Sequence, residues 1–553
     1  MTSCFCVCVV ILQSWGKTVC CASAEGIDSS VGSDCADRRQ AQLVASLREQ
    51  LAGCGDVAMH ETHISRVLLA GADAYKLKKP VNLGFLDFST LARRRRFAEE
   101  EVRLNRRLAP ALYLGVVPIT GTRAAPVLGG DGPALEYAVH MRRFSQTALL
   151  TRQRLTPEIA DALAERLAAF HADAPVVSAD ADYGTPAQVL APMLENFSVI
   201  RDAVAPDGQL VPQLSRLQQW TQTQYECLAS TLAQRRIDGY VRECHGDLHR
   251  GNIAVRDGEP LIFDCIEFNP ALRWIDTASE LAFLLMDLMH VGETAQARRL
   301  LNGYLMHSGD YGLLAVLRFY LVYRAMVRAK VTAIGAAQHH HADACQDDAL
   351  RGYVHRALVC SRPLMAPRIV LVCGLSGSGK TSLAAALAER LPLIHIRSDV
   401  ERKRLFALAP LARTRAQPGG GIYSADASAR TYARLLSLAR QCVQAGYGVL
   451  VDATFLAREQ RRPFRALAAE LGCAFDCLAL DAPREVLRRR VAARYSLGKD
   501  ASEADQRVLE HQLALRQALT PAERARTIFV DTRKSPVLDR LLPVLIGSGT
   551  AMR

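Results

Sequence analysis

One stretch of sequence decides the fold of the C-terminal part of the chain: Gly374-Leu375-Ser376-Gly377-Ser378-Gly379-Lys380-Thr381. It matches the pattern G-x-x-x-x-G-K-[ST] at every fixed position, between a strand-like run over 369–373 and a helix-like run over 382–391. Glycines at these positions let backbone N–H groups curl around phosphate oxygens. The stretch therefore predicts a phosphate-binding loop. A chance Gly/Ser turn is the alternative, and the fit of both flanks argues against it.

The loop supplies both kinds of contact that ATP with Mg²⁺ needs. Lys380 is expected to reach the β- and γ-phosphates, and the Thr381 hydroxyl to hold Mg²⁺. The residues predicted to bind the nucleotide here are Gly374, Ser376, Gly377, Ser378, Gly379, Lys380 and Thr381. Further strand-like runs alternate with helix-like segments, at 393–396, 448–452, 476–480 and 527–531. That order predicts an α/β domain with a mostly parallel sheet and right-handed crossovers.

A second nucleotide-handling signature lies upstream, in His245-Gly246-Asp247-Leu248-His249-Arg250-Gly251-Asn252. Asp247 and Asn252 have the D-x-x-x-x-N spacing of a kinase catalytic loop, and an apolar run then ends at Asp264. In kinase chemistry the first carboxylate accepts the proton of the attacking hydroxyl, so Asp247 is the predicted catalytic base. Asn252 and Asp264 are the predicted Mg²⁺ ligands. An ordinary surface turn is the alternative, since Asp, Gly and Asn favour turns.

The segments around this second signature predict an α+β domain of two lobes. Strand-like runs come first, at 63–69, 74–77 and 135–139, and one amphipathic helix lies among them at 97–108. Helices dominate from Pro157 onward, at 163–171, 277–288 and 313–331. This order of strands, one helix and then mostly helices around a catalytic loop is the plan of a protein kinase.

Length and composition are those of a globular chain of two or three domains. The sequence has 553 residues, of which 50% are hydrophobic and 22% charged, and it contains no run of 18 apolar residues. We therefore expect no membrane partner. The net charge of +12 suits anionic nucleotides and leaves nucleic acid open as a partner. Nucleic acid lacks support from the linear sequence, which has no interleaved aromatic and basic track. The one dense basic run, 93–96, is interpreted as a solvated helix face.

Cysteine placement predicts reduced thiols in the cytoplasm for most of the chain. Seven of the 16 cysteines fall before residue 55, and the rest scatter without metal-ligand spacing. Residues 1–38 are interpreted as a poorly ordered extension or the product of a start site set too early, with a signal peptide as the alternative. His339-His340-His341 with Asp343 and Cys345 could bind a metal, but a solvated histidine run is the favoured interpretation.

The upstream signature resembles the aminoglycoside phosphotransferase family, which has a protein-kinase-like fold and phosphorylates hydroxyl groups. The resemblance covers about 40–335 and is carried by 241–252, Phe263-Asp264 and Trp274-Ile275-Asp276. It implies Lys76 as the ATP-pairing lysine, with Lys78 as rival on the same strand face. It implies Glu101 as the partner carboxylate, with Glu100 as rival. Only Gly71 precedes Lys76, so no glycine-rich loop is expected to cover the phosphates.

The C-terminal part, about 367–545, is similar to small P-loop kinases of the gluconate-kinase, chloramphenicol-phosphotransferase and zeta-toxin type. The resemblance implies that Asp399 binds the acceptor, with Arg402 nearby, and that Asp452, at the end of an apolar strand, holds Mg²⁺ or its water. Arg488, Arg490 and Arg494 resemble a lid helix whose arginines neutralise charge on the transferring phosphoryl group. A solvated helix face is the alternative for each arginine.

The two modules in this order resemble a bacterial family described as bifunctional aminoglycoside phosphotransferase/ATP-binding proteins. The resemblance implies a kinase domain at 39–335, a connection at 336–366, a P-loop kinase domain at 367–545 and a tail at 546–553. We expect an ATP- and Mg²⁺-dependent phosphotransferase that acts on hydroxyls of small-molecule acceptors. The alternatives are a regulatory protein in which one module senses nucleotide, and an enzyme similar to polynucleotide 5′-kinases. Fold alone does not choose the acceptor.

Overall fold

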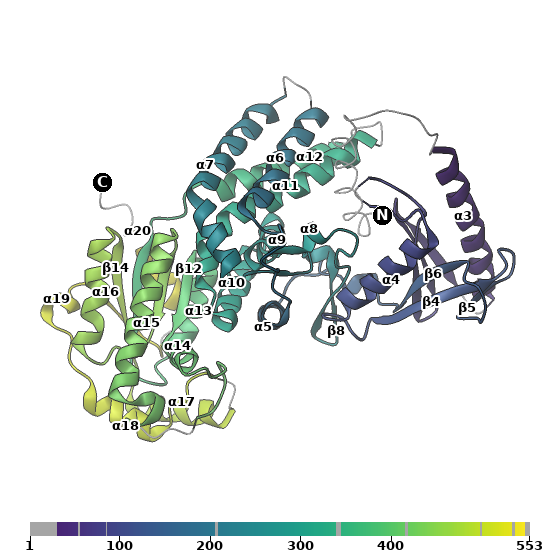
Figure 1. Ribbon diagram of the computed structural model, residues 1–553. Helices are drawn as coiled ribbons and strands as arrows, with labels where there is room; N and C mark the ends of the chain where they lie inside the picture. The colour runs from purple at the N-terminus through teal and green to yellow at the C-terminus, as the bar shows by residue number, and fades with distance from the viewer. Residues whose placement is uncertain are drawn as a thin grey trace. The chain divides into compact units, whose positions relative to one another are not determined.

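The computed structural model describes residues 30–53, 56–84, 86–204, 208–338, 344–414, 419–497, 500–533 and 537–547. The chain forms two compact units (Figure 1). The N-terminal unit comprises the described parts of 1–162, 170–293 and 316–361, and the C-terminal unit those of 163–169, 294–315 and 362–553. The segment 294–315, which the sequence predicts within the kinase domain, is therefore part of the C-terminal unit.

The N-terminal unit begins with an antiparallel sheet in the order β1-β2-β3-β6-β4-β5. Its strands are β1 (Val57–Glu61), β2 (Ser65–Ala70), β3 (Asp73–Lys78), β4 (Tyr113–Gly121), β5 (Pro126–Leu128) and β6 (Glu136–Arg142). Gly71, with a φ of +56°, makes the tight turn between β2 and β3, a backbone conformation that favours glycine. β3 lies between β2 and β6, which places Lys76 in the interior of the sheet.

Helix α4 (Leu91–Asn105) packs on this sheet and carries the basic run 93–96. The Thr90 side chain caps its first turn by accepting a hydrogen bond from the backbone N–H of Arg93. The interpretation of the run as a solvated face is wrong for Arg94, which is buried. Its guanidinium Nε donates to both carboxylate oxygens of Glu136 at 2.9 Å.

Helix α3 (Ser30–Ala52) packs against the same sheet. The expected boundary at residue 38 falls inside this helix. The Asp37 carboxylate accepts hydrogen bonds from the buried guanidinium of Arg66 at 2.9 and 3.0 Å. Helix α3 therefore extends N-terminal to that boundary, and Asp37 contacts the sheet through Arg66.

The rest of the N-terminal unit is mostly helical. Its longer helices are α6 (Pro186–Ala203), α7 (Leu210–Ile237), α9 (Thr277–His290) and α12 (Ala344–Ser361), together with α5 (Pro157–Asp173) outside 163–169 and α11 (Leu314–Gln338) from residue 316. Two small antiparallel pairs, β7 (Val241–Glu243) with β10 (Trp274–Asp276) and β8 (Ile253–Arg256) with β9 (Glu259–Ile262), frame the catalytic loop. The stretch expected as a connection is largely helix α12. The histidine run 339–341, Asp343 and the Cys345 side chain lie outside the described residues.

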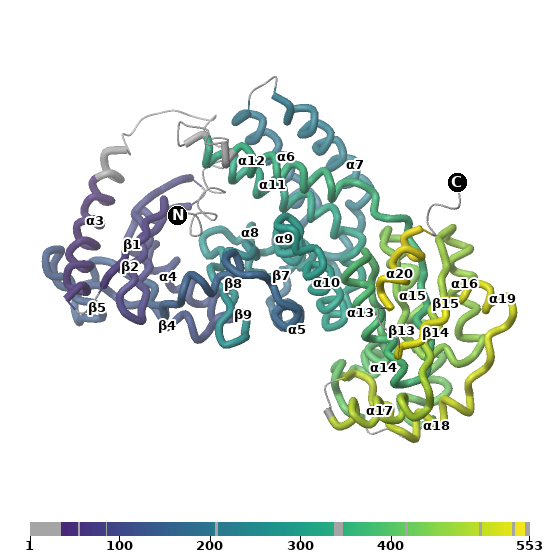
Figure 2. The backbone as a smooth tube through the Cα atoms, turned by 180° about the vertical axis from the view of Figure 1, so that it is seen from behind, coloured from purple at the N-terminus to yellow at the C-terminus, as the bar shows by residue number. Residues whose placement is uncertain are grey.

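The C-terminal unit holds a five-stranded, fully parallel sheet in the order β12-β13-β11-β14-β15, of which Figure 2 labels β13, β14 and β15. Its strands are β11 (Arg368–Cys373), β12 (Leu393–Arg397), β13 (Gly448–Asp452), β14 (Ala474–Asp481) and β15 (Thr527–Asp531). Central β11 is buried along its whole length, as a parallel strand covered on both faces requires. The predicted fold class is confirmed: a two-lobed α+β kinase-like part followed by a parallel α/β part.

Helix α10 (Thr294–Ser308) packs on helix α13 (Lys380–Arg390) and on edge strand β12 of this unit. The Asn302 side-chain amide pairs with that strand as another strand would. Its Oδ1 accepts from the His395 backbone N–H at 2.7 Å, and its Nδ2 donates to the Leu393 carbonyl at 3.3 Å. A side chain from an upstream helix thus satisfies backbone groups at an open sheet edge.

The described residues of both units show two further properties. None of the helices in this part of the chain combines the length and the apolarity that a bilayer crossing needs. The cysteines described there are free thiols: Cys35, Cys227, Cys244, Cys265, Cys360, Cys373, Cys442, Cys473 and Cys477.

Candidate active sites

In the N-terminal unit, three charged residues from distant segments meet at one point. Lys76 on β3 places its Nζ 2.8 Å from Glu101 Oε1 on α4 and 2.8 Å from Asp264 Oδ1. Glu101 is fully buried, whereas the Asp264 side chain is a quarter exposed. Lys76 therefore pairs with one fully buried carboxylate and with one partly exposed carboxylate.

The rivals of these residues occupy different positions. Lys78 lies on the same strand face and donates to the other Glu101 oxygen at 2.7 Å, but it is buried and also pairs with Glu267. Glu100 turns away from both lysines to Arg103 at 2.7 Å and Arg273 at 2.9 Å. The geometry therefore favours Lys76 and Glu101 over the two rivals.

Electrostatics holds this cluster in its charged form. Burial acts to raise the pKa of the Glu101 carboxyl, but the ammonium groups of Lys76 and Lys78 outweigh it and hold that pKa at about 2. Burial likewise acts to lower the pKa of Lys76, and the carboxylates of Asp264 and Glu101 reverse the effect and hold it well above its ordinary value. A permanent ammonium at this position is suited to pairing with phosphates.

An apolar cavity of about 50 Å³ adjoins Lys76 and Asp264. Its walls include Val67, Ala74 and the connection after β6, where Phe144 stands 5.2 Å from the ring of Phe263. Sequence reasoning did not select Val67, Ala74, Phe144 and Phe263, because apolar residues of this kind are indistinguishable from core before the fold is known. An apolar slot beside a lysine and a carboxylate suits the base of a nucleotide.

The catalytic-loop residues predicted from the sequence lie close together and are buried. The Asn252 side-chain amide donates to Asp247 Oδ2 at 3.0 Å and to the Asp247 backbone carbonyl at 3.0 Å. His249 Nε2 is 3.3 Å from the same carboxylate oxygen. His245 Nδ1 accepts from the Asp247 backbone N–H at 3.2 Å, while its Nε2 faces the Phe263 carbonyl at 2.8 Å. The loop is held from within by its own side chains.

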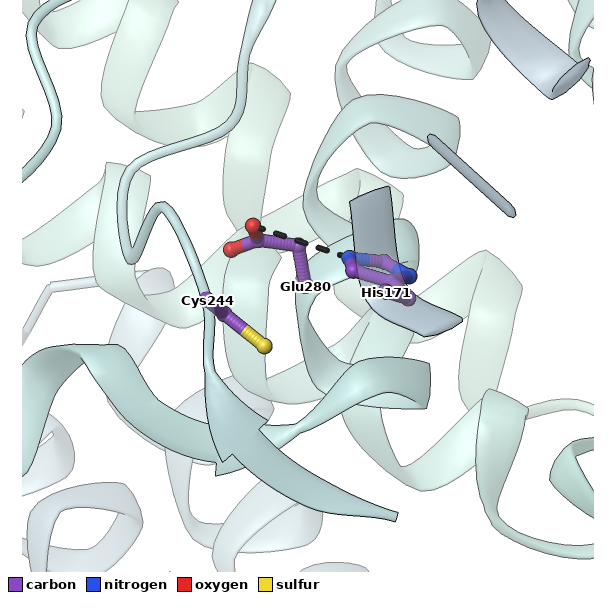
Figure 3. A group of neighbouring side chains, drawn as sticks. All are labelled: His171, Cys244 and Glu280. Atoms are coloured by element: carbon purple, nitrogen blue, oxygen red, sulfur yellow. Dashed lines mark ion pairs between the residues drawn. The ribbon is translucent and has the colours of Figure 1, made fainter. Parts of the chain in front are cut away.

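Glu280 on α9 fixes the backbone of the catalytic loop, a role that the sequence did not reveal. Its carboxylate accepts the backbone N–H groups of His245 at 2.6 Å and Gly246 at 2.9 Å. Figure 3 shows it between His171, 3.8 Å away, and the Cys244 thiol. Burial acts to raise the Glu280 pKa, and its contacts with the two histidines hold it below the ordinary value. Both oxygens are thus engaged in positioning the loop.

The backbone at Asp264 is itself unusual. Asp264 has a φ of +65°, a region that non-glycine residues rarely occupy. The Tyr113 hydroxyl accepts its backbone N–H at 3.2 Å, and Asn105 Oδ1 accepts the next one, from Cys265, at 2.9 Å. Strain that neighbours hold in place is typical of functional sites.

In the C-terminal unit the predicted loop joins β11 to α13, whose first residue is Lys380. Gly377 and Gly379 have φ values of +81° and +89°, which turn successive N–H groups toward one centre. The Ser378 hydroxyl is buried and has no hydrogen-bond partner among the described residues. The loop thus presents a free hydroxyl at a helix N-terminus, a position suited to a phosphate oxygen.

The predicted metal-handling residues of this unit are in direct contact. The Thr381 hydroxyl donates to Asp452 Oδ2 at 2.7 Å, and His395 Nε2 lies 3.3 Å from the same oxygen. Lys380 folds back to donate to the Leu375 carbonyl at 2.9 Å. Burial acts to raise the Asp452 pKa, but His395 and Lys380 hold it at about 2. A hydroxyl and a permanent carboxylate beside the phosphate loop are hard oxygen ligands that fit Mg²⁺.

The remaining predicted residues surround this loop in different ways. Arg490 donates to the Thr532 hydroxyl at 2.9 Å and to the Gly377 carbonyl at 3.4 Å, so it touches the phosphate loop. Arg494 donates to the Ala504 carbonyl at 3.2 Å. Burial lowers the pKa of Lys380, and the charges of Asp399 and Arg494 both act on that ammonium, with opposite signs.

Arg488 and Arg402 lie farther from the chemistry. Arg488 forms an exposed ion pair with Glu510 at 2.7 Å, as a solvated helix face would. Arg402 is buried, donates to the Ile422 carbonyl at 2.9 Å and lies 5.1 Å from the ring of Tyr423. Burial raises the pKa of Tyr423, and Asp399 adds to the rise. Arg402 and Tyr423 thus pack together, and the charge of Asp399 acts both on Tyr423 and on Lys380 of the loop.

Comparison with known proteins matches both units to described families. The family described as the phosphotransferase enzyme family matches residues 70–320, and the family described as an AAA domain matches residues 369–519. An uncharacterized protein of Mycobacterium tuberculosis is 31% identical over 455 residues, which span 81% of this chain and 88% of the relative.

Two solved structures each resemble one part of the chain. A sugar kinase from Janibacter sp. is 26% identical and covers 32% of this chain and 94% of its own, with a TM-score of 0.26. Amicoumacin kinase, in complex with AMP-PNP, Ca²⁺ and its ligand, is 15% identical and covers 57% of this chain and 95% of its own, with a TM-score of 0.37.

The full-length relative and the two family matches agree on one architecture. The match to the relative continues across most of both chains, so the two units occur together in it as they do here. The chain is a phosphotransferase and belongs to the bacterial family of bifunctional aminoglycoside phosphotransferase/ATP-binding proteins, in which a phosphotransferase domain precedes a P-loop kinase-like domain.

Proposed function

We propose that both units transfer the γ-phosphoryl group of ATP, with Mg²⁺, to hydroxyl groups of small-molecule acceptors. The observation that carries the proposal is the position of Lys76, which contacts Glu101 and Asp264 at 2.8 Å beside an apolar cavity. A fixed ammonium between an anchoring carboxylate and a metal-binding carboxylate is what a kinase needs to orient a triphosphate.

In the N-terminal unit, Asp247 would accept the proton of the attacking hydroxyl while Lys76 orients the phosphates. Asn252 and Asp264 would hold Mg²⁺, which supplies charge neutralisation when bound. Asn252 also contacts the Asp247 carboxylate at 3.0 Å, so the base and one metal ligand are fixed relative to each other. Catalysis is then positioning plus electrostatics rather than covalent chemistry.

In the C-terminal unit, the backbone of the phosphate loop and Lys380 would bind the triphosphate, and Thr381 with Asp452 would hold Mg²⁺. Arg490 and Arg494 would neutralise charge on the transferring group, and Asp399 would bind the acceptor hydroxyl. The 2.7 Å contact between Thr381 and Asp452 supports this assignment, because the hydroxyl and the carboxylate proposed to hold Mg²⁺ are already in contact with each other.

The test uses the full chain with one site disabled at a time. Wild type, Asp247→Asn and Lys380→Ala are incubated with γ-labelled ATP and Mg²⁺ against pools of sugars, aminoglycosides, nucleosides and other hydroxyl compounds. Two acceptor products, one lost in each variant, are expected.

Three other outcomes decide between the alternatives. A single product that Lys380→Ala changes only in rate would favour the regulatory function of the C-terminal unit. Label on oligonucleotide 5′ ends alone would favour the polynucleotide-kinase alternative. No labelled product from any pool would contradict the proposal.

A further inference from the structure

Helix α16 (Arg458–Glu470) of the C-terminal unit carries a row of arginines on one face. The spacing i, i+3, i+4, i+7 places Arg458, Arg461, Arg462 and Arg465 above one another. Together with Arg526 they line one cavity, beneath which lie apolar side chains of the sheet. Five arginines therefore line a single depression of the surface.

Most of this charge has no counterpart in the protein. Arg461 is buried and paired with Glu523 at 2.8 Å, and it also donates to the Phe455 carbonyl at 2.8 Å. Arg458, Arg462, Arg465 and Arg526 are exposed, and none forms an ion pair or a side-chain hydrogen bond within the described part of the chain. By contrast, Arg440 and Glu470 nearby pair directly. The cavity rim is therefore strongly positive.

The placement of these arginines opposes the stability of their own helix. Arg458 and Arg461 lie in the first turn of α16, at the positive end of the helix dipole, where cations are unfavourable and where Glu459 is the acidic residue. Only Arg461 gains a compensating partner. A local conflict without a structural gain points to a binding role for the remaining arginines.

A second cavity continues the first. The two share Arg461 and Leu519, and the second is lined by Arg516 and Arg524. Phe529 on β15 also lines it, with 56% of its surface exposed and its ring 5.3 Å from the Arg524 guanidinium. The two cavities together therefore carry exposed arginines and one exposed aromatic ring, although Arg516 among them pairs with Asp481 at 3.6 Å.

We propose that this track, formed by Arg458, Arg462, Arg465, Arg526, Arg524 and Phe529, binds single-stranded nucleic acid. A cationic groove with an aromatic platform matches a ligand that has regularly spaced anions and flat bases. An acidic peptide would use the arginines but leave the exposed ring without a matching group. A single mononucleotide would occupy one of the two cavities and leave the other unused.

The track runs toward the phosphate-binding loop. Gly374 and Leu375 of that loop line the second cavity together with Phe529. A strand bound along both cavities would therefore lie beside the nucleotide site of the C-terminal unit. The linear sequence does not show this track, because its residues come from α16, from the segment 516–526 and from β15.

The test measures binding of the full chain to fluorescein-labelled single strands by fluorescence anisotropy. The strands have about 12 nucleotides, a length within the usual site size of one single-strand-binding domain. RNA and DNA strands are compared, and the salt dependence of Kd is recorded. The variant R462Q/R465Q/R526Q removes three unpaired rim charges. The control R484Q/R507Q/R540Q removes three exposed arginines of the same unit that line neither cavity.

The rim variant is expected to raise Kd at least about tenfold and to reduce the slope of log Kd against log salt by about 2, because each lost phosphate contact to a single strand contributes about 0.7. Phe529→Leu, which keeps an apolar side chain, is expected to weaken binding about tenfold through lost base stacking. The control variant should stay within about twofold of wild type, since it lies off the track.

Three results would overturn the proposal. Absence of binding to either RNA or DNA is the first. Equal losses in the rim and control variants are the second, because they would show attraction to net charge alone. The third is equal competition by a polyaspartate peptide together with an unchanged Kd in Phe529→Leu, which would assign the track to an acidic protein segment. Binding that prefers RNA or DNA identifies which strand the track takes.

Discussion

The Gln512 side chain accepts a hydrogen bond from the backbone N–H of Ser376 at 2.9 Å, inside the phosphate-binding loop. Gln512 belongs to helix α18 (Gln506–Leu515), far from the loop in sequence. Its carboxamide oxygen occupies a donor of the loop that is suited to a phosphate oxygen. Binding of a triphosphate to this donor therefore requires that the glutamine leave.

Gln512→Ala is expected to tighten ATP binding at the C-terminal site by about fivefold, because a net hydrogen bond worth about 1 kcal/mol no longer competes. Calorimetry in an Asp264→Ala background, which disables the other site, measures this affinity. Gln506→Ala, an exposed glutamine on the same helix, is the control and should leave it unchanged. Weaker binding in Gln512→Ala would mean that the glutamine contacts the nucleotide instead.

Asp247 and Asp264 should separate by function. In a Lys380→Ala background, Asp247→Asn is expected to reduce phosphoryl transfer by about 10²–10⁴, the usual contribution of a general base, with ATP affinity preserved. Asp264→Ala removes a Mg²⁺ ligand and one of the two carboxylates that hold Lys76, so it should weaken binding of ATP with Mg²⁺ as well. Rates and calorimetry together distinguish them. Equal loss of ATP binding in both variants would show that the two roles are not separate.

Local patterns in the sequence predicted much of this molecule. The five strands of the parallel sheet lie where apolar runs placed them, since a central parallel strand is apolar along its length. The motifs predicted Asp247 with Asn252 and Thr381 with Asp452, and the fold brings each pair into contact. Such motifs are local, and local spacing is what a sequence shows directly.

Long-range relationships were not predictable in the same way. No local feature marks Gln512 as a partner of Ser376 or Glu280 as the residue that holds the catalytic loop. The packing of α10 in the C-terminal unit depends on surfaces that form only after folding. Arg94 appeared as one of four similar arginines, and only the position of Glu136 makes it buried.

Asn302 is expected to stabilise edge strand β12 of the parallel sheet. Asn302→Ala leaves the His395 N–H and the Leu393 carbonyl without their partner, at a cost of about 1 kcal/mol. Hydrogen exchange of the β12 amides in the full chain should therefore accelerate about fivefold. Gln441→Ala, exposed on helix α15 (Ala425–Gln444) of the same unit, is the control. Unchanged exchange at His395 would contradict the role of Asn302.

Glu101 should contribute stability that depends on pH with a defined sign. Its folded pKa of about 2 lies below the ordinary value of 4.5, so its contribution is fully present above pH 4.5 and is lost as the pH falls through about 2. At 1.36 kcal/mol for each pKa unit, this contribution is about 3 kcal/mol. Glu101→Gln should therefore lower the free energy of unfolding by about that amount at pH 7, because it leaves Lys76 and Lys78 buried with one partner fewer.

The difference in the free energy of unfolding between wild type and Glu101→Gln should shrink steadily between pH 4.5 and 2, where the wild-type carboxyl itself becomes protonated. Urea unfolding followed by tryptophan fluorescence measures it, since the tryptophans described, Trp220 and Trp274, both lie in the N-terminal unit. Glu99→Gln, on the same helix in an exposed pair with Arg95, is the control and should cost less than about 1 kcal/mol at any pH. A difference that stays constant with pH would show that the ion pairs of Glu101 do not set its pKa.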